Sequence, residues 1–259
     1  MKAGYFTVNG ISSERLNLLI EERPDIQTPK RRLSFVSPVS YDGELVYDDD
    51  GYEPTEFELK CFYDGSSHGD NFEKLSEART AIHTFFNHGS GDWLSLVPYF
   101  DEKHVYSIIM TEIKFSNKSY YEGCMEVIIK LKCQPYKYLV DNNEIEVGNN
   151  GRFVNETHYT SKPTVRFSGV KGGITIRLND ISLSFRDLNN ETVFIDSETF
   201  STFSKDINGY RNLNDRTLGK EFFTMVPGNN FIQWQRPAAD TTSTIPEKMY
   251  IKPNWRTLV

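Results

Sequence analysis

The segment Gly65-Ser66-Ser67-His68-Gly69 is a literal G-x-S-x-G, the pattern that surrounds the nucleophilic serine of many hydrolases. In those enzymes the serine sits on a tight turn between a strand and a helix, and a histidine elsewhere accepts its proton. Ser67 would be the nucleophile here, with His104 or His158 as its base. That turn belongs to a parallel sheet with alternating helices, which the sequence downstream does not predict. We therefore interpret the segment as a polar turn and expect no catalytic residue.

Acidic and histidine clusters do not reach the spacing of a known metal site either. Asp48-Asp49-Asp50-Gly51 suggests a calcium loop, but aligning its glycine places Val46 at the first ligand position and Phe57 at the last. Both positions need oxygen donors, so the aspartates are interpreted as an exposed, acidic hairpin tip. His83 and His88 are five residues apart on a predicted helix, which is the wrong spacing for two ligands on one face. We expect no metal.

Cofactor and redox motifs are also absent from the sequence. Gly172-Gly173 and Gly219-Lys220 lack the other residues of a phosphate-binding loop. The three cysteines, Cys61, Cys124 and Cys133, form no C-x-x-C pair, and Cys61 and Cys133 fall on the apolar side of predicted strands. Such cysteines are expected to be buried free thiols, as suits folding in a reducing cytoplasm. We expect no cofactor.

Charge and hydropathy exclude two further classes of protein. The 259 residues carry a formal net charge of −7, which disfavours a grip on nucleic acid, because phosphate binding depends on lysine and arginine. No apolar run approaches the roughly 20 residues that cross a bilayer. The first residues lack the apolar stretch of a signal peptide, so neither secretion nor membrane insertion is expected.

Alternating hydrophobicity in the first half predicts an antiparallel sheet with one buried face. The clearest strands cover residues 56–63 and 124–133, with a third over 105–115. Apolar residues at three- and four-residue spacing predict one long helix over 71–88, packed across the sheet. Pro135 is expected to end the strand that precedes it, in the segment LKCQPYKY at 131–138.

The second half of the sequence has a different pattern of polar and apolar residues. Residues 141–157 are polar and rich in turn formers, which predicts an entry segment between domains that proteases cut first. Short strands then follow at close intervals without a helix, which favours a β-sandwich. They are predicted at 165–167, 174–178, 181–185, 193–195, 222–226 and 231–234. We place the domains at 1–139 and 140–259, and the last strand, near Trp255, could return to the first domain.

Several motifs in this order resemble one family. The mid-chain LKCQPYKY, the closing VPGNNFIQW (226–234) and MYIKPNW (249–255), and the opening GYFTVNGISSERLNLLI (4–20) are similar to segments of the distal tail protein (Dit) of long-tailed bacteriophages. Residues 40–63 look like its Asp-Gly hairpin, although many relatives carry Gly-Arg where this chain has Ser40-Tyr41. VFIDSET (193–199) also matches. The resemblance covers nearly the whole chain.

The resemblance implies a structural hub of the virion, at the distal end of the tail. The N-terminal domain would have a fold like that of tail-tube proteins, a β-barrel or sandwich, and would form a homohexameric ring. The C-terminal domain would be a galectin-like or carbohydrate-module-like sandwich. Implied partners are the tail tube protein, a tail-associated lysin or tail fibre protein, and receptor-binding or baseplate proteins. Six copies at −7 each carry −42 charges, and such a channel lets DNA pass without binding it.

One alternative stays open from the residues alone. A β-sandwich can bind cell-wall saccharide by stacking sugars on exposed aromatic side chains. Tyr159, Tyr210 and Trp234 are candidates for that role, although aromatic residues of a sandwich belong to its core more often.

Overall fold

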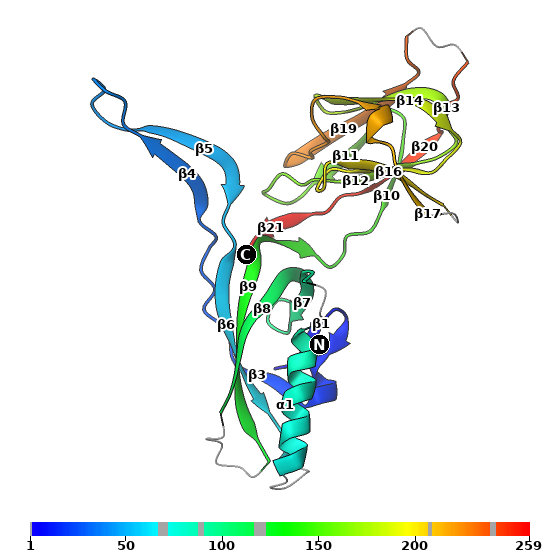
Figure 1. Ribbon diagram of the computed structural model, residues 1–259. Coiled ribbons are helices and arrows are strands. Elements are labelled where there is room, and N and C mark those ends of the chain that lie inside the picture. Colours follow the sequence, from blue (N-terminus) through cyan, green and yellow to red (C-terminus); the bar gives the residue numbers. More distant parts are fainter. Residues whose placement is uncertain (1, 67–71, 88–90, 117–122, 207–208, 239–241) are drawn as a thin grey trace. The chain divides into compact units, whose positions relative to one another are not determined.

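The computed structural model describes residues 2–66, 72–87, 91–116, 123–206, 209–238 and 242–259 (Figure 1). Its described residues are mainly β with one α-helix, which confirms the predicted fold class. The chain forms two compact units, residues 1–140 with 258–259 and residues 141–257. The chain therefore passes between the units twice, once after Val140 and once after Thr257.

The first unit is built on an eight-stranded antiparallel sheet in the order β2-β1-β7-β8-β9-β6-β3, with β21 also paired to β9. A short 3-10 helix, Ser13–Leu16, separates β2 from β3, and a second, two-stranded sheet consists of β4 (Arg31–Val36) and β5 (Leu45–Tyr52). The strands of the large sheet are β1 (Phe6–Val8), β2 (Ile11–Ser12), β3 (Leu18–Glu22), β6 (Thr55–Tyr63), β7 (Leu94–Pro98), β8 (His104–Ser116), β9 (Met125–Leu139) and β21 (Arg256–Leu258).

The strands β6 and β9 carry the alternation on which the sheet prediction depended. Along β6, Phe57, Leu59 and Cys61 are buried while Glu58 and Lys60 between them are exposed. Leu59 lies opposite Ile129 of β9, so the apolar faces of both strands coincide. The strands predicted at 56–63, 105–115 and 124–133 are confirmed. Their alternation has a period of two residues, which places the apolar side chains of each strand on the one face that packs into the core.

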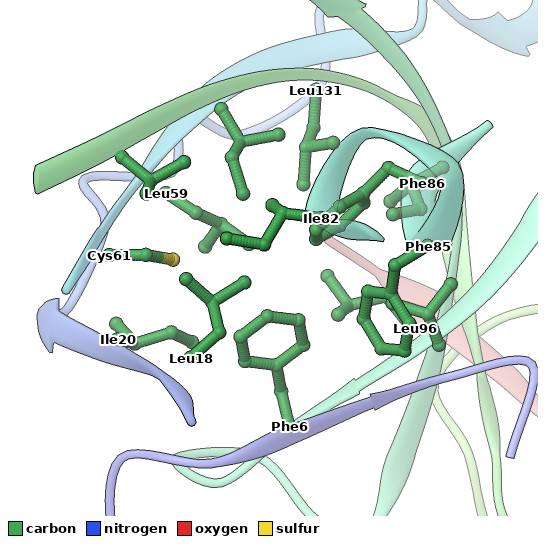
Figure 2. Close-up of a cluster of buried hydrophobic side chains, with 14 of the residues drawn as sticks. Phe6, Leu18, Ile20, Leu59, Cys61, Ile82, Phe85, Phe86, Leu96 and Leu131 are labelled. Atoms are coloured by element: carbon green, nitrogen blue, oxygen red, sulfur yellow. The ribbon is translucent and has the colours of Figure 1, made fainter. Parts of the chain in front are cut away.

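The helix α1 (Phe72–Phe86) covers that apolar face. Its Ile82, Phe85 and Phe86 are buried among side chains of the sheet, as Figure 2 shows. The ring of Phe6, on β1, lies 6.2 Å from that of Phe85 and 5.9 Å from that of Phe86. The predicted helix over 71–88 is confirmed, and its expected ends at Asn71 and His88 lie outside the described residues.

The prediction that Pro135 ends its strand is wrong. The strand β9 continues to Leu139, and Tyr106 of β8 still pairs with Lys137 beyond the proline. The register between β8 and β9 shifts between Tyr106 and Ile108, which is where Pro135 passes. A bulge leaves backbone groups out of the ladder, so a residue without an N–H is tolerated there. The Pro135 carbonyl oxygen accepts a hydrogen bond from the Val259 N–H at 3.0 Å.

The second unit is a sandwich of a six-stranded and a five-stranded antiparallel sheet, in the orders β10-β20-β12-β15-β16-β17 and β11-β19-β13-β14-β18. Both sheets contribute to one core, where the ring of Phe167 meets that of Phe185 at 5.7 Å. A 3-10 turn, Asn214–Arg216, precedes β18. The strands are β10 (Ile145–Gly148), β11 (Gly151–Asn155), β12 (Thr164–Phe167), β13 (Lys171–Leu178), β14 (Ile181–Asn189), β15 (Val193–Asp196), β16 (Ser201–Asp206), β17 (Gly209–Asn212), β18 (Thr217–Leu218), β19 (Gly228–Gln235) and β20 (Lys248–Lys252).

Two predictions in this half are wrong. Residues 141–157 are no loose entry segment, because they contain β10 and β11, which pair with β20 and β19 in opposite sheets. Buried Val147 and Phe153 anchor them, so protease access at that segment is no longer expected. Residues 222–226 form no strand, only an isolated bridge between Met225 and Ser161.

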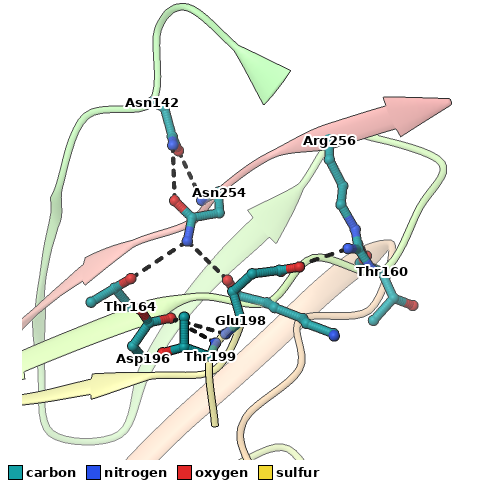
Figure 3. Close-up of polar contacts among 9 residues, drawn as sticks. Asn142, Thr160, Thr164, Asp196, Glu198, Thr199, Asn254 and Arg256 are labelled. Atoms are coloured by element: carbon teal, nitrogen blue, oxygen red, sulfur yellow. Dashed lines mark hydrogen bonds and ion pairs between the residues drawn. The ribbon is translucent and has the colours of Figure 1, made fainter. Parts of the chain in front are cut away.

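The chain's entry into the second unit is bonded to its exit (Figure 3). The side-chain amide of Asn142 donates to Asn254 Oδ1 at 3.0 Å, and the Asn254 N–H donates to Asn142 Oδ1 at 2.8 Å. Arg256, which is buried, donates from Nε to the Thr160 carbonyl at 2.7 Å. Asn254 has a φ of 53°, a left-handed conformation that asparagine tolerates better than most residues. These hydrogen bonds join the start of the second unit to its end.

Truncation of the helix side chain at the centre of the first core should be costly. We expect Ile82→Ala to lower the free energy of unfolding of the first unit by about 2–5 kcal/mol, because it leaves a cavity under the helix. The exposed His83, on the same helix, provides the control, and His83→Ala should change stability by less than about 0.5 kcal/mol. Denaturant titration followed by circular dichroism measures both, and equal midpoints for the two variants would contradict this packing.

Candidate interaction surface

The two-stranded sheet β4–β5 has no core of its own. Its antiparallel register places Phe35 opposite Val46 and Val36 opposite Leu45. All six residues of β4 are exposed, and so are the first six of β5. An isolated two-stranded hairpin is marginally stable in water at best. The hairpin can be followed in Figure 1 as the blue ribbons β4 and β5.

The hairpin also carries apolar side chains that remain in water. Phe35 is 57% exposed and Val39, at the tip, is 98% exposed. The other exposed large apolar residues of residues 31–52 are Leu33, Val36, Tyr41, Leu45, Val46 and Tyr47. Grouped apolar exposure of this kind marks a surface that another protein covers. Each strand pairs only with the other within the described residues, so both outer edges can accept a further strand.

The three aspartates that were predicted to form the tip of a hairpin lie in one of its strands instead. Asp48, Asp49 and Asp50 belong to the strand β5, and the connection between the strands is residues 37–44. Asp48 forms an ion pair with Arg31 across the two strands and also accepts a hydrogen bond from the Asp50 N–H at 3.0 Å. Asp48 is therefore used in cross-strand pairing. The prediction of an acidic tip is wrong, because the turn formers Ser40 and Gly43 make the connection.

One histidine suggested as a catalytic base belongs to a structural network. His104 Nδ1 lies 2.6 Å from Asp101 Oδ1, and Asp101 Oδ2 accepts hydrogen bonds from the Tyr106 hydroxyl at 2.7 Å and from Lys137 Nζ at 2.7 Å. The three partners come from the start of β8 and the end of β9, so Asp101 binds these strands together beyond the bulge at Pro135. Burial alone would raise the pKa of Asp101, but the three hydrogen bonds outweigh it and lower the pKa below its usual value.

Only some of the remaining catalytic and metal candidates lie in the part of the chain that the structure describes. Ser67, His68 and His88 lie outside the described residues, while His83 and His158 are exposed. No group of three histidine, cysteine, aspartate or glutamate residues that could hold a metal occurs among the residues that the structure describes.

The cysteines are confirmed as buried free thiols. Burial raises the pKa of the Cys61 thiol and raises that of Cys133 to about 12, so neither is a thiolate at neutral pH. Such thiols pack as small apolar groups and do not act as nucleophiles.

The three aromatic candidates for sugar stacking have different environments. Trp234 is buried, and its Nε1 donates to the Pro246 carbonyl at 2.9 Å, so it belongs to the core. Tyr159 is half-buried, whereas Tyr210 is exposed on β17. Sequence reasoning missed the two rings beside Tyr210, those of Phe194 and Phe203. No signal for them exists in the sequence, because Phe194 lies between the apolar Val193 and Ile195, and the buried neighbours of Phe203 are polar.

Within the described residues, no helix is long and apolar enough to cross a membrane. No protein-family model matches the chain, and no curated protein matches it in sequence. Its fold is nevertheless similar to that of a phage Dit protein. The Dit protein of phage SPP1, described as a paradigm of the hub adsorption apparatus in phages that infect Gram-positive bacteria, matches with a TM-score of 0.69 and 13% identity, over 98% of this chain and 99% of that one. A chain of the phage p2 baseplate, in its activated conformation with Sr, matches with a TM-score of 0.50 and 8% identity, over 95% and 97%.

Replacing the aspartate of the network should give a pH-dependent loss of stability. Because the folded pKa of Asp101 is depressed, its contribution is fully present above the unfolded value of about 3.9 and disappears as the pH falls through the folded value. We expect Asp101→Asn to destabilise the first unit by about 1–3 kcal/mol at pH 7, where hydrogen bonds to a charged group are lost.

The difference from the wild type should shrink as the pH is lowered below about 4. Denaturation midpoints at pH 7, 5 and 3 measure it, and Asp180→Asn, at a nearly fully exposed ion pair with Arg177, is the control that should change little. A difference that stays constant across this pH range would show that the Asp101 carboxylate is not what stabilises the network.

Proposed function

We propose that this protein is the distal tail hub of a bacteriophage or prophage, a hexameric ring that joins the tail tube to the baseplate or receptor-binding apparatus. The observation that carries the proposal is the likeness to the SPP1 Dit protein over nearly the full length of both chains. The motifs that resemble the Dit family support it independently, because they run from residues 4–20 to 249–255 in one order. Its place is the distal end of the tail in the virion.

The hairpin β4–β5 supplies the surface that a ring needs. A closed ring requires a heterologous interface, in which one patch of a subunit meets a different patch of the next. The hairpin offers exposed apolar residues such as Phe35 and Val46 and two free strand edges. Strand pairing with the neighbouring subunit would satisfy those edges and bury the apolar side chains together. The first unit therefore carries the ring contacts, and the sandwich remains available to other baseplate proteins.

The outer face of the large sheet suits the wall of a DNA channel. Lys130 of β9 lies 2.8 Å from Glu112 of β8, and Lys60 of β6 lies 2.6 Å from Glu22 of β3. Exposed pairs of this kind add little stability. Their consequence is electrostatic, since a lysine held by a carboxylate attracts phosphate weakly. A face of this kind, in a ring of net negative charge, lets DNA pass without holding it.

Ring formation should fail when the hairpin loses its apolar contacts. We expect the double variant Phe35→Ser, Val46→Ser to raise the dissociation constant of the oligomer at least tenfold, because both side chains become buried only on assembly. The fold of the subunit should persist, since both residues are exposed in it. Sedimentation velocity at increasing protein concentration measures the oligomer.

The matched control for this variant is Val154→Ser, which removes an apolar side chain of similar exposure from the second unit. It should assemble like the wild type. Rings of the double variant that form at the wild-type concentration would exclude the hairpin from the interface. A protein that forms only dimers under all conditions would contradict the hub itself.

We also propose that the hub is not an enzyme. The G-x-S-x-G segment follows β6, which pairs antiparallel with β9, whereas the nucleophile elbow of hydrolases belongs to a parallel sheet. We expect the purified protein to release no product from peptidoglycan or from ester substrates, and Ser67→Ala to behave like the wild type. Saturable turnover that disappears in Ser67→Ala would replace the hub proposal with a tail-associated hydrolase.

A further inference from the structure

The outer face of the six-stranded sheet carries a row of stacked side chains across five adjacent strands. We call this set the aromatic row. In strand order it consists of Tyr250 on β20, Arg166 on β12, Phe194 on β15, Phe203 on β16 and Tyr210 on β17. The register supports it, because Arg166 pairs with both Tyr250 and Phe194, and Phe194 pairs with Phe203.

Contacts join the aromatic row in two groups, and the register of β12 and β15 places Arg166 of the first group opposite Phe194 of the second. The guanidinium carbon of Arg166 lies 4.1 Å from the ring centroid of Tyr250. The rings of Phe194 and Phe203 are 5.2 Å apart and nearly parallel, at 10°. Phe203 and Tyr210 follow at 4.8 Å and 29°. Stacked rings on a sheet present their edges outward as an apolar strip, and the last ring keeps one face uncovered.

The aromatic row is not part of the sandwich core. On β15, Val193 and Ile195 are buried, and Phe194 between them points to the opposite side of the sheet. Tyr210, at the edge strand, is 61% exposed. None of these rings belongs to the buried core of the second unit or packs against it, so their gathering on one face points to a ligand.

A row of polar side chains runs beside the aromatic row, two residues further along three of the same strands. Thr164 pairs with Asp196, and Asp196 pairs with Ser201. Asn254 Nδ2 also lies 3.5 Å from Thr164 Oγ1, as Figure 3 shows. Residues two apart on a strand point to the same face, about 7 Å from one another. The face therefore offers an apolar strip with hydroxyl, carboxylate and amide groups along its side.

Two cations of this face are already paired. Arg166 Nη2 lies 2.6 Å from Glu144 Oε2, and Lys248 Nζ lies 2.9 Å from Glu146 Oε2. Lys252, opposite Thr164, and Lys205, opposite Tyr210, add two further positive charges to the face. The carboxylate of Asp196, which also lies opposite Thr164, disfavours an anionic ligand at the polar residues. A neutral ligand with apolar faces and many hydroxyl groups matches both rows, and among biological polymers a polysaccharide has that chemistry.

We propose that the aromatic row and the polar residues beside it form a binding site for a neutral polysaccharide of the bacterial surface. The site would stack sugar faces on Tyr210 and the ring edges next to it, while Thr164, Asp196 and Ser201 meet the hydroxyls. The site deepens the proposed tail hub and depends on it only for its place in the virion. A single shallow site binds weakly, and six copies in one ring would raise the apparent affinity by roughly 10²-fold or more when they engage one polymer together.

Affinity electrophoresis of the full-length protein tests the site. Native gels would contain one of three neutral polymers, glycol chitin, hydroxyethyl cellulose or galactomannan, or the anionic polymer dextran sulfate. We expect retardation by at least one neutral polymer, at least threefold weaker in Tyr210→Ala and retained in Tyr210→Phe, which keeps the ring. Val154→Ala, at an exposed side chain of the five-stranded sheet and outside both the hairpin and the aromatic row, is the control and should bind like the wild type.

Four results would overturn the site: no retardation by any neutral polymer, retardation by dextran sulfate alone, binding unchanged in Tyr210→Ala, or loss of binding in Val154→Ala as well. Co-sedimentation with a tail protein that depends on Tyr210, without polysaccharide binding, would assign the face to a protein partner and also overturn it. Sedimentation velocity on the same samples separates this outcome from failure of the hub, because Tyr210→Ala leaves the hairpin unchanged.

Discussion

The structure depends on one constraint, that a two-stranded hairpin cannot bury its own apolar side chains. Strands β4 and β5 pair with each other and, within the described residues, with no other strand, so Phe35 and Val46 remain in water. Burial of apolar area contributes about 25 cal/mol per Å², and side chains of this size leave a substantial driving force unused in the single chain. Association with another copy would use that driving force, which is why we assign the ring contacts to this hairpin.

The rest of the first unit holds the hairpin in place. β5 leads into β6, which lies in the large sheet beside β9 and under the core that Ile82 and Phe86 of the helix complete. The hydrogen bonds of Asp101 then fix the end of β9 beyond the bulge, just before the chain passes to the second unit. In the second unit, the bonds between Asn142 and Asn254 join the entering and leaving chain. In each unit, polar contacts within that unit therefore fix the chain near the points where it passes to the other unit.

Sequence reasoning predicted the parts in which one periodicity dominates. The strands β6, β8 and β9 and the helix α1 were predictable because each buries one continuous face, and alternation or 3.6-residue spacing reports that directly. The prediction for Pro135 was wrong because proline has no N–H to donate to the neighbouring strand. The bulge that makes this donor unnecessary depends on the register with β8, which the local sequence does not show. Residues 141–157 were misread because their asparagines and glycines outweighed the buried Val147 and Phe153.

The candidate sites were less predictable because they depend on which strands lie side by side. Tyr210 was singled out from the sequence, but Phe194 and Phe203 join it only through the register of β15, β16 and β17. The aspartates of β5 were misplaced for the same reason, since the partner of Asp48 is Arg31 on the facing strand. The local sequence pattern predicts which face of a strand a side chain occupies, whereas the pairing of strands decides which side chains lie next to it.

Electron cryo-microscopy of tail tips from intact virions tests the central claim most directly. The account predicts six copies of this chain in a closed annulus at the end of the tail tube, with Phe35 and Val46 of each copy buried against the next. An annulus in which the hairpins remain in solvent would contradict the assigned interface. Location of the chain on the capsid or on side fibres would contradict the hub.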